Sequence, residues 1–382
     1  MRRSIFVPEH EQFRHTARSF FEKECVPHTE RWEKSGQVDR DVWKKAGAHG
    51  LIGWEMPEEF GGLGIKDFRF NAILNEEFHA TGAVGLGLGV QNDIVAGYFT
   101  ELTTDEQKKR WLPKYVTGEY ITAIAMSEPG AGSDLARIAT TARKDGDHYI
   151  LNGSKTFISN GILADLVLVV CRTDPQADKP HQGISLLVVE DGMEGFSRGR
   201  KLDKIGQKSA DTAELFFQDV RVPAENLIGE ENRGFYHLMQ NLPAERLGIA
   251  VHAVAQARRA LALTVDYAHE RKAFGQEIGH FQVNRHAIAE MRTKVDVMTT
   301  YVDQCILAVN ADELTAEEAA GAKWWATETQ WEILDRCLQL HGGYGYVNEY
   351  EIARLWRDAR VQRLYGGTNE IMKDLIGRSM GF

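Results

Sequence analysis

The strongest constraint on the fold is a pair of apolar stripes at helical spacing in residues 233–382. Steps of three and four residues are the period of one face of an α-helix. The first stripe comprises Ile288, Met291, Val295, Met298, Val302, Cys305 and Val309, and the second comprises Ala320, Trp324, Thr327, Trp331, Leu334 and Leu338. Helices with one apolar face bury it against each other. With further helices expected over about 246–271 and after Thr368, residues 233–382 are predicted to form a four-helix bundle.

The region before the β-rich part of the chain, residues 1–120, is predicted to be an N-terminal helical domain. Its helices are separated by glycine-rich turns, with Pro8 near the start of the first helix and Asp105 in the acidic first turn of another. The glycine-rich residues 85–89 do not fit a dinucleotide-binding loop, and no strand precedes them. We interpret them as small residues that allow close helix packing.

Residues 121–232 show short apolar runs that are typical of strands. The turn dipeptides Asp145-Gly146 and Asn152-Gly153 bracket a strand at 148–151, and further strands are predicted at 166–171, 184–189 and 213–217. Strands without intervening helices predict a mainly antiparallel β domain rather than a doubly wound nucleotide fold. The predicted fold class is therefore α+β, mainly α.

Charge and cysteine usage exclude several classes of protein. A net charge of -10 leaves no basic surplus for binding a nucleic-acid backbone. The four cysteines stand in different predicted elements without C-x-x-C spacing, so we expect no disulfide framework, no metal and a reducing compartment. The longest clean apolar run, residues 166–171, is too short for membrane insertion, and the amino terminus lacks an apolar signal segment. We expect a cytoplasmic protein, or a matrix protein if this is the mature form of an imported one.

A loop at residues 124–134 concentrates glycine, proline and serine after an apolar run. Its glycines allow backbone amides to approach a ligand, and Ser127 and Ser133 add hydroxyl donors suited to a pyrophosphate or a polar ring edge. From composition alone, an ordinary turn is the alternative interpretation.

Five separated segments resemble the acyl-CoA dehydrogenases, in order and at matching intervals over essentially the whole chain. They are residues 124–134, 157–161, 271–275, 339–343 and 365–370. The resemblance is closest to the long-chain branch of that family. It implies the same helix, β-domain and helix-bundle layout that the periodicity predicts.

The resemblance further implies bound FAD between the β domain and the bundle, partly shared with a neighbouring subunit of a homotetramer. Residues 339–343 would reach the cofactor from that neighbour, and Arg271 and Gln282 would hold its adenine half. The implied cofactor residues are Ile124, Ala125, Met126, Ser127, Glu128, Pro129, Gly130, Ala131, Gly132, Ser133, Phe157, Ile158, Ser159, Arg271, Gln282, Gln339, Leu340, His341, Gly342, Gly343, Thr368, Asn369 and Glu370. Glu128 is expected to orient loop backbone rather than act as a base.

The catalytic base is the point where this sequence departs from much of the family. Many members carry a glutamate where Gly366 stands, whereas the long-chain and isovaleryl-CoA dehydrogenases carry it on the first bundle helix, at a position that Glu245 matches. Glycine at 366 is expected to clear volume that Glu245 fills, and the Gly366 N–H to donate to the thioester oxygen. Pro243 is expected to bend the helix near Glu245. The alternative for Glu245 is an exposed helical glutamate paired with a basic neighbour.

The implied acyl-CoA contacts are Ser133, His181, Gln182, Tyr236, Pro243, Ala244, Glu245, Arg246, Gly366 and Gly367. Of these, His181 and Gln182 fall in a polar, proline-containing loop for which flexible solvent exposure is an equal alternative. The pair Cys337 and His341, four residues apart, is interpreted as a packed cysteine and a backbone-bonded histidine, since no second ligand pair accompanies it.

The resemblance implies FAD-dependent α,β-dehydrogenation of acyl-CoA thioesters to trans-2-enoyl-CoA. Glu245 would take the α proton, and the β hydrogen would leave as hydride for flavin N5. An electron-transfer flavoprotein is the expected electron acceptor. Two alternatives remain open: a flavin oxidase or monooxygenase on the same fold, and a catalytically silent acyl-CoA-binding protein. Acyl chain length and branching also stay open.

Overall fold

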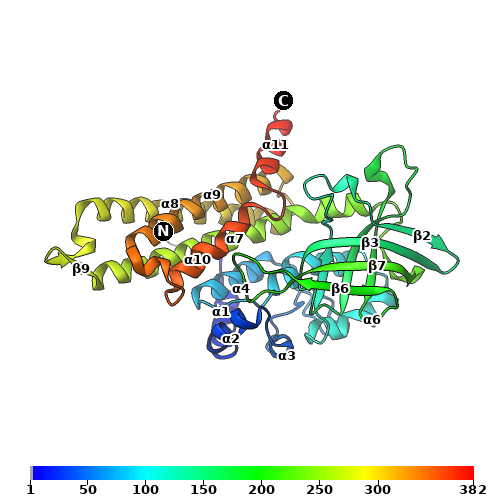
Figure 1. Cartoon of the computed structure of the whole chain (residues 1–382), viewed down its shortest axis with the longest axis horizontal. Helices are drawn as coiled ribbons and strands as arrows, with labels where there is room; N and C mark the ends of the chain where they lie inside the picture. Colours follow the sequence, from blue (N-terminus) through cyan, green and yellow to red (C-terminus); the bar gives the residue numbers. More distant parts are fainter. Residues whose placement is uncertain (1–2) are drawn as a thin grey trace.

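The protein folds as three regions in chain order, and two of them are mainly helical (Figure 1). The structure, a computed structural model, describes residues 3–382. The β domain lies at one end of the molecule, and the long helices extend from it to the hairpin at the other end. This arrangement confirms the predicted α+β, mainly α class.

The N-terminal region consists of six α-helices. They are α1 (Pro8–Phe20), α2 (Thr29–Ser35), α3 (Arg40–Ala48), α4 (Phe68–Ala80), α5 (Ala96–Glu101) and α6 (Asp105–Val116). Pro8 stands in the first turn of α1, where a missing N–H costs nothing. A reciprocal capping box between Thr104 and Gln107 starts α6. A π-helical turn, Val90–Val95, leads directly into α5.

The middle region is one sheet in the order β6-β7-β3-β2-β4-β5-β8, with β1 beside β4. Its strands are β1 (Thr122–Ala125), β2 (Thr141–Asp145), β3 (His148–Ser159), β4 (Leu166–Arg172), β5 (Ile184–Glu190), β6 (Phe196–Lys201), β7 (Thr212–Pro223) and β8 (Leu227–Ile228). Only the pairings of β4 with β1 and with β2 are parallel. The turn predicted at Asn152-Gly153 is wrong, because β3 continues through it with a register shift against β7.

The C-terminal region confirms the predicted helices but corrects the bundle, because the core of residues 3–382 includes Ile352 and Leu355 of a helix at 351–359 and no residue of the helix after Thr368. Its helices are α7 (Gly234–Glu270), α8 (Gln282–Asn310), α9 (Ala316–His341), α10 (Glu351–Ala359) and α11 (Asn369–Ser379), with a hairpin of β9 (Lys272–Ala273) and β10 (Gln276–Glu277) after α7. The α8 and α9 stripes form the core, where Met298, Val302 and Leu334 are buried. The expected start of α7 at about 246 is wrong, since the helix begins at Gly234 and contains Pro243. Helix α10 was not predicted.

Helix α7 connects the regions. Its 37 residues span about 55 Å at 1.5 Å per residue. One side packs on α8, α9 and α10, another packs on α4, and its first turns contact β5. Across residues 3–382, no helix has the length and apolarity that crossing a membrane requires.

Candidate active site

A cavity of about 870 Å³ lies where the N-terminal region, the β domain and α7 meet. Its wall combines the segment after α4, the loop after β1, the end of β3, one face of α7 and the loop before α11. The residues selected from the sequence that line it are Ile124, Met126, Ser127, Gly132, Ser133, Phe157, Ile158, Ser159, Glu245, Arg246, Gly366 and Gly367. Segments far apart in the sequence therefore form a single site.

The loop after β1 is supported by a buried ion pair. Lys155 Nζ donates to Glu128 Oε1 at 2.8 Å and to Met126 O at 2.9 Å, while the Ala139 and Thr140 N–H groups also donate to Glu128. Burial opposes ionisation, but the charge of Lys155 and these hydrogen bonds lower the pKa of Glu128. Glu128 thus orients the loop backbone, as predicted. The other loop residues outside the cavity wall are Ala125, Pro129, Gly130 and Ala131.

Phe157 presents an aromatic ring to the cavity from the end of β3. The residue is 70% exposed, and its φ of 60° lies in the left-handed region that aromatic residues rarely adopt. Ser159, two residues further along the strand, is also exposed and lines the cavity. An exposed ring beside hydroxyl donors suits the stacking of a planar heterocycle.

Glu245 projects from α7 into the cavity and is not the exposed glutamate of the alternative interpretation. Only 6% of the residue is exposed. Its Oε1 accepts a hydrogen bond of 2.9 Å from the Tyr98 hydroxyl of α5. Burial raises the pKa of the carboxyl to about 7, against the opposing hydrogen bond from Tyr98 and the charge of Arg246. This carboxylate therefore exchanges its proton near neutral pH, as a general base should.

The loop at Gly366 lies against α7 and is held from two sides. Arg246 Nε donates to Gly366 O at 3.3 Å, and the buried Lys323 donates to Gly367 O at 2.8 Å. Gly366 has φ of 64°, and a Cβ added there would overlap Ile249 Cδ1. The expectation that Glu245 fills the space beside Gly366 is therefore corrected, because Ile249, one helical turn along α7, occupies it.

Residues 368–370 lie outside the cavity wall. The Thr368 hydroxyl caps α11 by accepting from Ile371 N, and Asn369 is buried with its Oδ1 accepting from Lys323 Nζ at 2.8 Å. Glu370 is exposed. Within this single chain, Thr368 and Asn369 shape the loop that carries Gly366.

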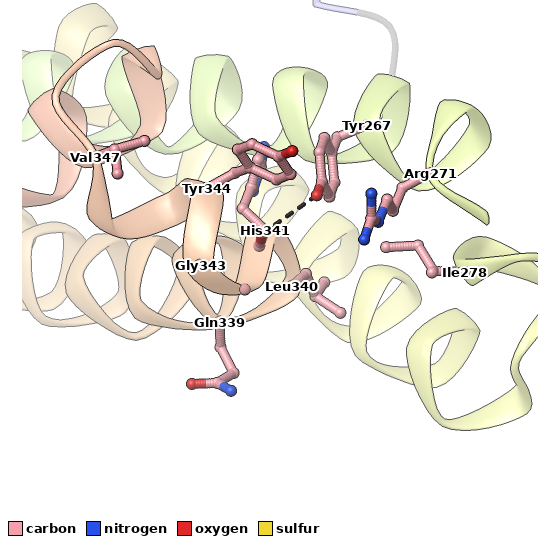
Figure 2. Close-up of a pocket in the computed structure, with 10 residues that line it drawn as sticks. Tyr267, Arg271, Ile278, Gln339, Leu340, His341, Gly343, Tyr344 and Val347 are labelled. Atoms are coloured by element: carbon pink, nitrogen blue, oxygen red, sulfur yellow. Dashed lines mark hydrogen bonds between the residues drawn. The ribbon is translucent and has the colours of Figure 1, made fainter. Parts of the chain in front are cut away.

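A second hollow, of about 560 Å³, gathers another set of predicted cofactor residues (Figure 2). It is formed at the junction of α7 and α9 by Tyr267, Arg271, Gln339, Leu340, His341, Gly342, Gly343 and Tyr344, among others. The Tyr267 and His341 rings stack 4.4 Å apart, and the Tyr267 hydroxyl donates to His341 O. No lining residue is shared with the first cavity.

This hollow corrects the expected division of the cofactor contacts. Arg271 was predicted to act separately from residues 339–343, but it lies with them. Arg271 directly precedes β9, so this second hollow lies beside the hairpin, at the opposite end of the molecule from the β domain (Figure 1). Gln282, the exposed first residue of α8, lines neither hollow.

Two further predicted groups are accounted for by packing. The His181 ring lies 5.4 Å from Phe235 and 6.0 Å from Tyr236, so it contacts the first turn of α7. Gln182 belongs to the same short 3-10 turn, while Pro243 and Ala244 stand on α7 beside the base.

The buried Cys337 packs in the bundle core and its carbonyl pairs with His341 Nδ1 at 2.8 Å, as predicted. Among residues 3–382, no group of acidic, histidine or cysteine side chains suits a metal ion.

Several cavity residues were missed or misinterpreted. Gly85 and Gly87 do not serve helix packing, because added Cβ atoms would meet Ser209 and Asn160 of the β domain. His79, Asp93 and His252 also line the cavity, but nothing in their sequence context indicated a site.

Three family descriptions cover almost the whole chain. Residues 7–119 match "Acyl-CoA dehydrogenase, N-terminal domain", residues 123–220 match "Acyl-CoA dehydrogenase, middle domain" and residues 232–381 match "Acyl-CoA dehydrogenase, C-terminal domain".

Individual relatives agree over the full length. The mitochondrial long-chain specific acyl-CoA dehydrogenase of Sus scrofa is 50% identical over 99% of this chain and 88% of its own. The acyl-CoA dehydrogenase structure from Geobacillus kaustophilus is 51% identical, with a TM-score of 0.96 and 99% of both chains covered. A glutaryl-CoA dehydrogenase from Mycobacterium smegmatis, in complex with FADH2, is 26% identical with a TM-score of 0.91, covering 99% of this chain and 95% of its own. The chain belongs to the acyl-CoA dehydrogenase family, whose members are oxidoreductases.

Proposed function

We propose that this chain dehydrogenates long-chain acyl-CoA thioesters between the α and β carbons, with FAD as cofactor and Glu245 as the base. The observation that supports this most directly is the buried Glu245 carboxyl, which lines the central cavity and has a pKa of about 7. A base with a pKa near the working pH can both hold and release a proton efficiently. The raised pKa of Glu245 also argues against the alternative that the chain is a catalytically silent acyl-CoA-binding protein.

The cavity wall fits FAD. The exposed Phe157 ring offers a stacking surface, and the loop after β1 offers Ser127, Ser133 and the backbone at Gly132 as polar contacts. When bound, FAD would accept the β hydrogen as a hydride at N5.

The protein's own residues supply the proton chemistry. Glu245 takes the α proton from the thioester, and the Gly366 N–H donates to the thioester oxygen on which negative charge develops. Gly366 lines the cavity, and no hydrogen bond from its N–H is found within residues 3–382. Arg246 holds the Gly366 carbonyl and Lys323 holds the Gly367 carbonyl, so these two bonds restrain the loop that carries this N–H.

Anaerobic flavin reduction by acyl-CoA thioesters of increasing chain length tests the proposal. The FAD-loaded enzyme is expected to lose its yellow colour with long chains. Glu245→Gln should bind FAD and acyl-CoA but reduce flavin at least about 100-fold more slowly, the lower end of what a general base contributes. Full flavin reduction by this variant would falsify the assignment of the base. Rapid peroxide formation in air would instead identify an oxidase.

We also propose a homotetramer that passes electrons to an electron-transfer flavoprotein. The second hollow holds predicted cofactor residues but shares none with the first cavity, so one cofactor can meet both sets if a second copy supplies the hollow. A molar mass near four chains of 43.0 kDa is expected in solution. If the enzyme is a monomer in solution and still binds FAD tightly, this arrangement is contradicted.

A further inference from the structure

The far part of the main cavity, beyond Glu245, contains a polar group within an apolar wall. On α7, His252 follows Glu245 by seven residues, which places it about 10 Å further along the helix. The cavity wall between them includes the apolar side chains of Phe78, Ile94 and Ile249. A substrate chain that passes the base toward His252 therefore crosses apolar surface before it meets this polar group.

Two histidines from different helices form the first part of this polar group. His79 of α4 and His252 of α7 are joined by a hydrogen bond of 2.8 Å between His79 Nε2 and His252 Nδ1. Burial lowers the pKa of both rings, to about 4 for His252, so both are neutral at pH 7. In a neutral pair one ring donates and the other accepts. The outer nitrogen, His252 Nε2, can thus present a donor or an acceptor.

Asp93 supplies a second polar atom beside His252. A Cβ placed on Gly89 would lie 3.2 Å from His252 Nε2 and 3.4 Å from Asp93 Oδ2, so both atoms face the volume that this glycine leaves free. The Asp93 carboxylate accepts from Asn71 and Asn75, which leaves part of its acceptor capacity unused. His252 Nε2 has no hydrogen-bond partner among the described residues.

We infer that the cavity binds an acyl chain that carries a hydroxyl group several methylenes beyond the reacting carbons, between His252 and Asp93. A hydroxyl can accept from His252 Nε2–H and donate to Asp93 Oδ2 at once. An unsubstituted chain leaves His252 Nε2 unpaired and leaves Asp93 Oδ2 with its bond from Asn75 alone. A chain that ends in a carboxylate is disfavoured, because Asp93 repels it and the histidines are neutral. The cavity cation closest to His79, Arg354, already donates to Gly82 O and faces Glu351 at 3.9 Å. This inference rests on the proposed function, since it names the substrate class of the same cavity.

The test compares matched substrates in the FAD-loaded enzyme. Anaerobic flavin reduction is measured with one long unsubstituted acyl-CoA, with the same chain hydroxylated at successive positions, and with the chain ending in a carboxylate. At one position, or two adjacent ones, the hydroxylated chain should exceed the unsubstituted chain in kcat/KM by roughly tenfold, as two net hydrogen bonds allow. The carboxylate-ended chain should react more slowly than the unsubstituted one.

Two variants separate the polar site from general damage to the cavity. His252→Leu removes the hydrogen-bonding atom, and Gly89→Ala keeps both histidines but fills the volume between His252 Nε2 and Asp93 Oδ2. Gly89 has φ of -62°, which alanine also adopts, so a folded protein is expected. Each variant should abolish the preference for the hydroxylated chain, while His15→Leu, at an exposed position on α1, should retain it.

The outcomes are distinguishable. A hydroxyl preference that disappears in both cavity variants supports the inference. Equal rates at every hydroxyl position, or a preference that survives His252→Leu, overturn it while unsubstituted chains still reduce the flavin. If none of the acyl-CoA thioesters reduces the flavin, the proposed function itself fails.

Discussion

Replacing Glu245 by glutamine should stabilise the protein in alkaline buffer while abolishing its chemistry. The folded protein raises the pKa of this carboxyl from its ordinary value of 4.5 to about 7, chiefly by burial. A raised pKa means that folding favours the protonated form. The resulting stability is fully present below pH 4.5 and is lost as the pH rises through about 7. At about 1.36 kcal/mol per pKa unit, ionised Glu245 costs about 3 kcal/mol at pH 8.5.

Glutamine removes this cost because it resembles the neutral acid. It keeps an oxygen that can accept from the Tyr98 hydroxyl, so the packing is preserved. Wild type and Glu245→Gln should therefore unfold at similar temperatures at pH 5. At pH 8.5 the variant should be more stable by up to about 3 kcal/mol.

Thermal unfolding of the FAD-loaded enzyme at both pH values measures this difference. Glu22→Gln, at an exposed position, controls for the loss of one charge. It should shift the unfolding temperature equally little at both pH values. The reasoning is refuted if Glu245→Gln is less stable than wild type at pH 8.5, or if its advantage is the same at pH 5.

Three further substitutions, at Tyr98, Gly366 and Lys155, test other contacts of the site. Tyr98→Phe removes a hydrogen bond that lowers the pKa of the base, so the acidic limb of the kcat/KM profile should move to higher pH; an unmoved limb contradicts this role. Gly366→Ala forces a left-handed alanine against Ile249 and should cost about 1–3 kcal/mol of stability and much of the activity. Adding Ile249→Ala should restore part of both in thermal and kinetic assays, and no recovery contradicts the overlap. Lys155→Met leaves the Glu128 charge buried and unpaired, which should cost about 3–5 kcal/mol. Glu128→Gln in the same chain should recover most of this loss on denaturation, and an additive second loss contradicts the pairing.

The broad fold could be predicted because it depends on local periodicity. The α8 and α9 stripes repeat for many turns, and the strand runs at 166–171 and 184–189 are almost wholly apolar, so each indicates its own structure. The start of α7 could not be predicted, because its first turns are partly exposed and Pro243 interrupts the pattern. Gly153 looked like a turn glycine, but its pairing across the sheet turns it into a bulge.

The residues of the site also fall into two groups, those that the sequence predicted and those that it could not. Motif wording predicted Glu245 and Ser159, which line the cavity, and also Arg271, which lies with residues 339–343 instead. Neither motif nor periodicity could indicate His79, Asp93 and His252, which come from three separate segments and meet through tertiary packing alone. Ile249 occupies the volume beside Gly366 for a similar reason, since its direction depends on how α7 docks.

The hydrogen bond between Tyr98 and Glu245 joins a hydroxyl from the N-terminal helices to a carboxylate from the C-terminal bundle. A nascent or truncated chain that has folded only one of these parts lacks one partner of this hydrogen bond. Where only the bundle has folded, Glu245 has no Tyr98 hydroxyl to orient its carboxylate. Turnover with the pH dependence of the intact enzyme therefore requires that both parts have folded and met.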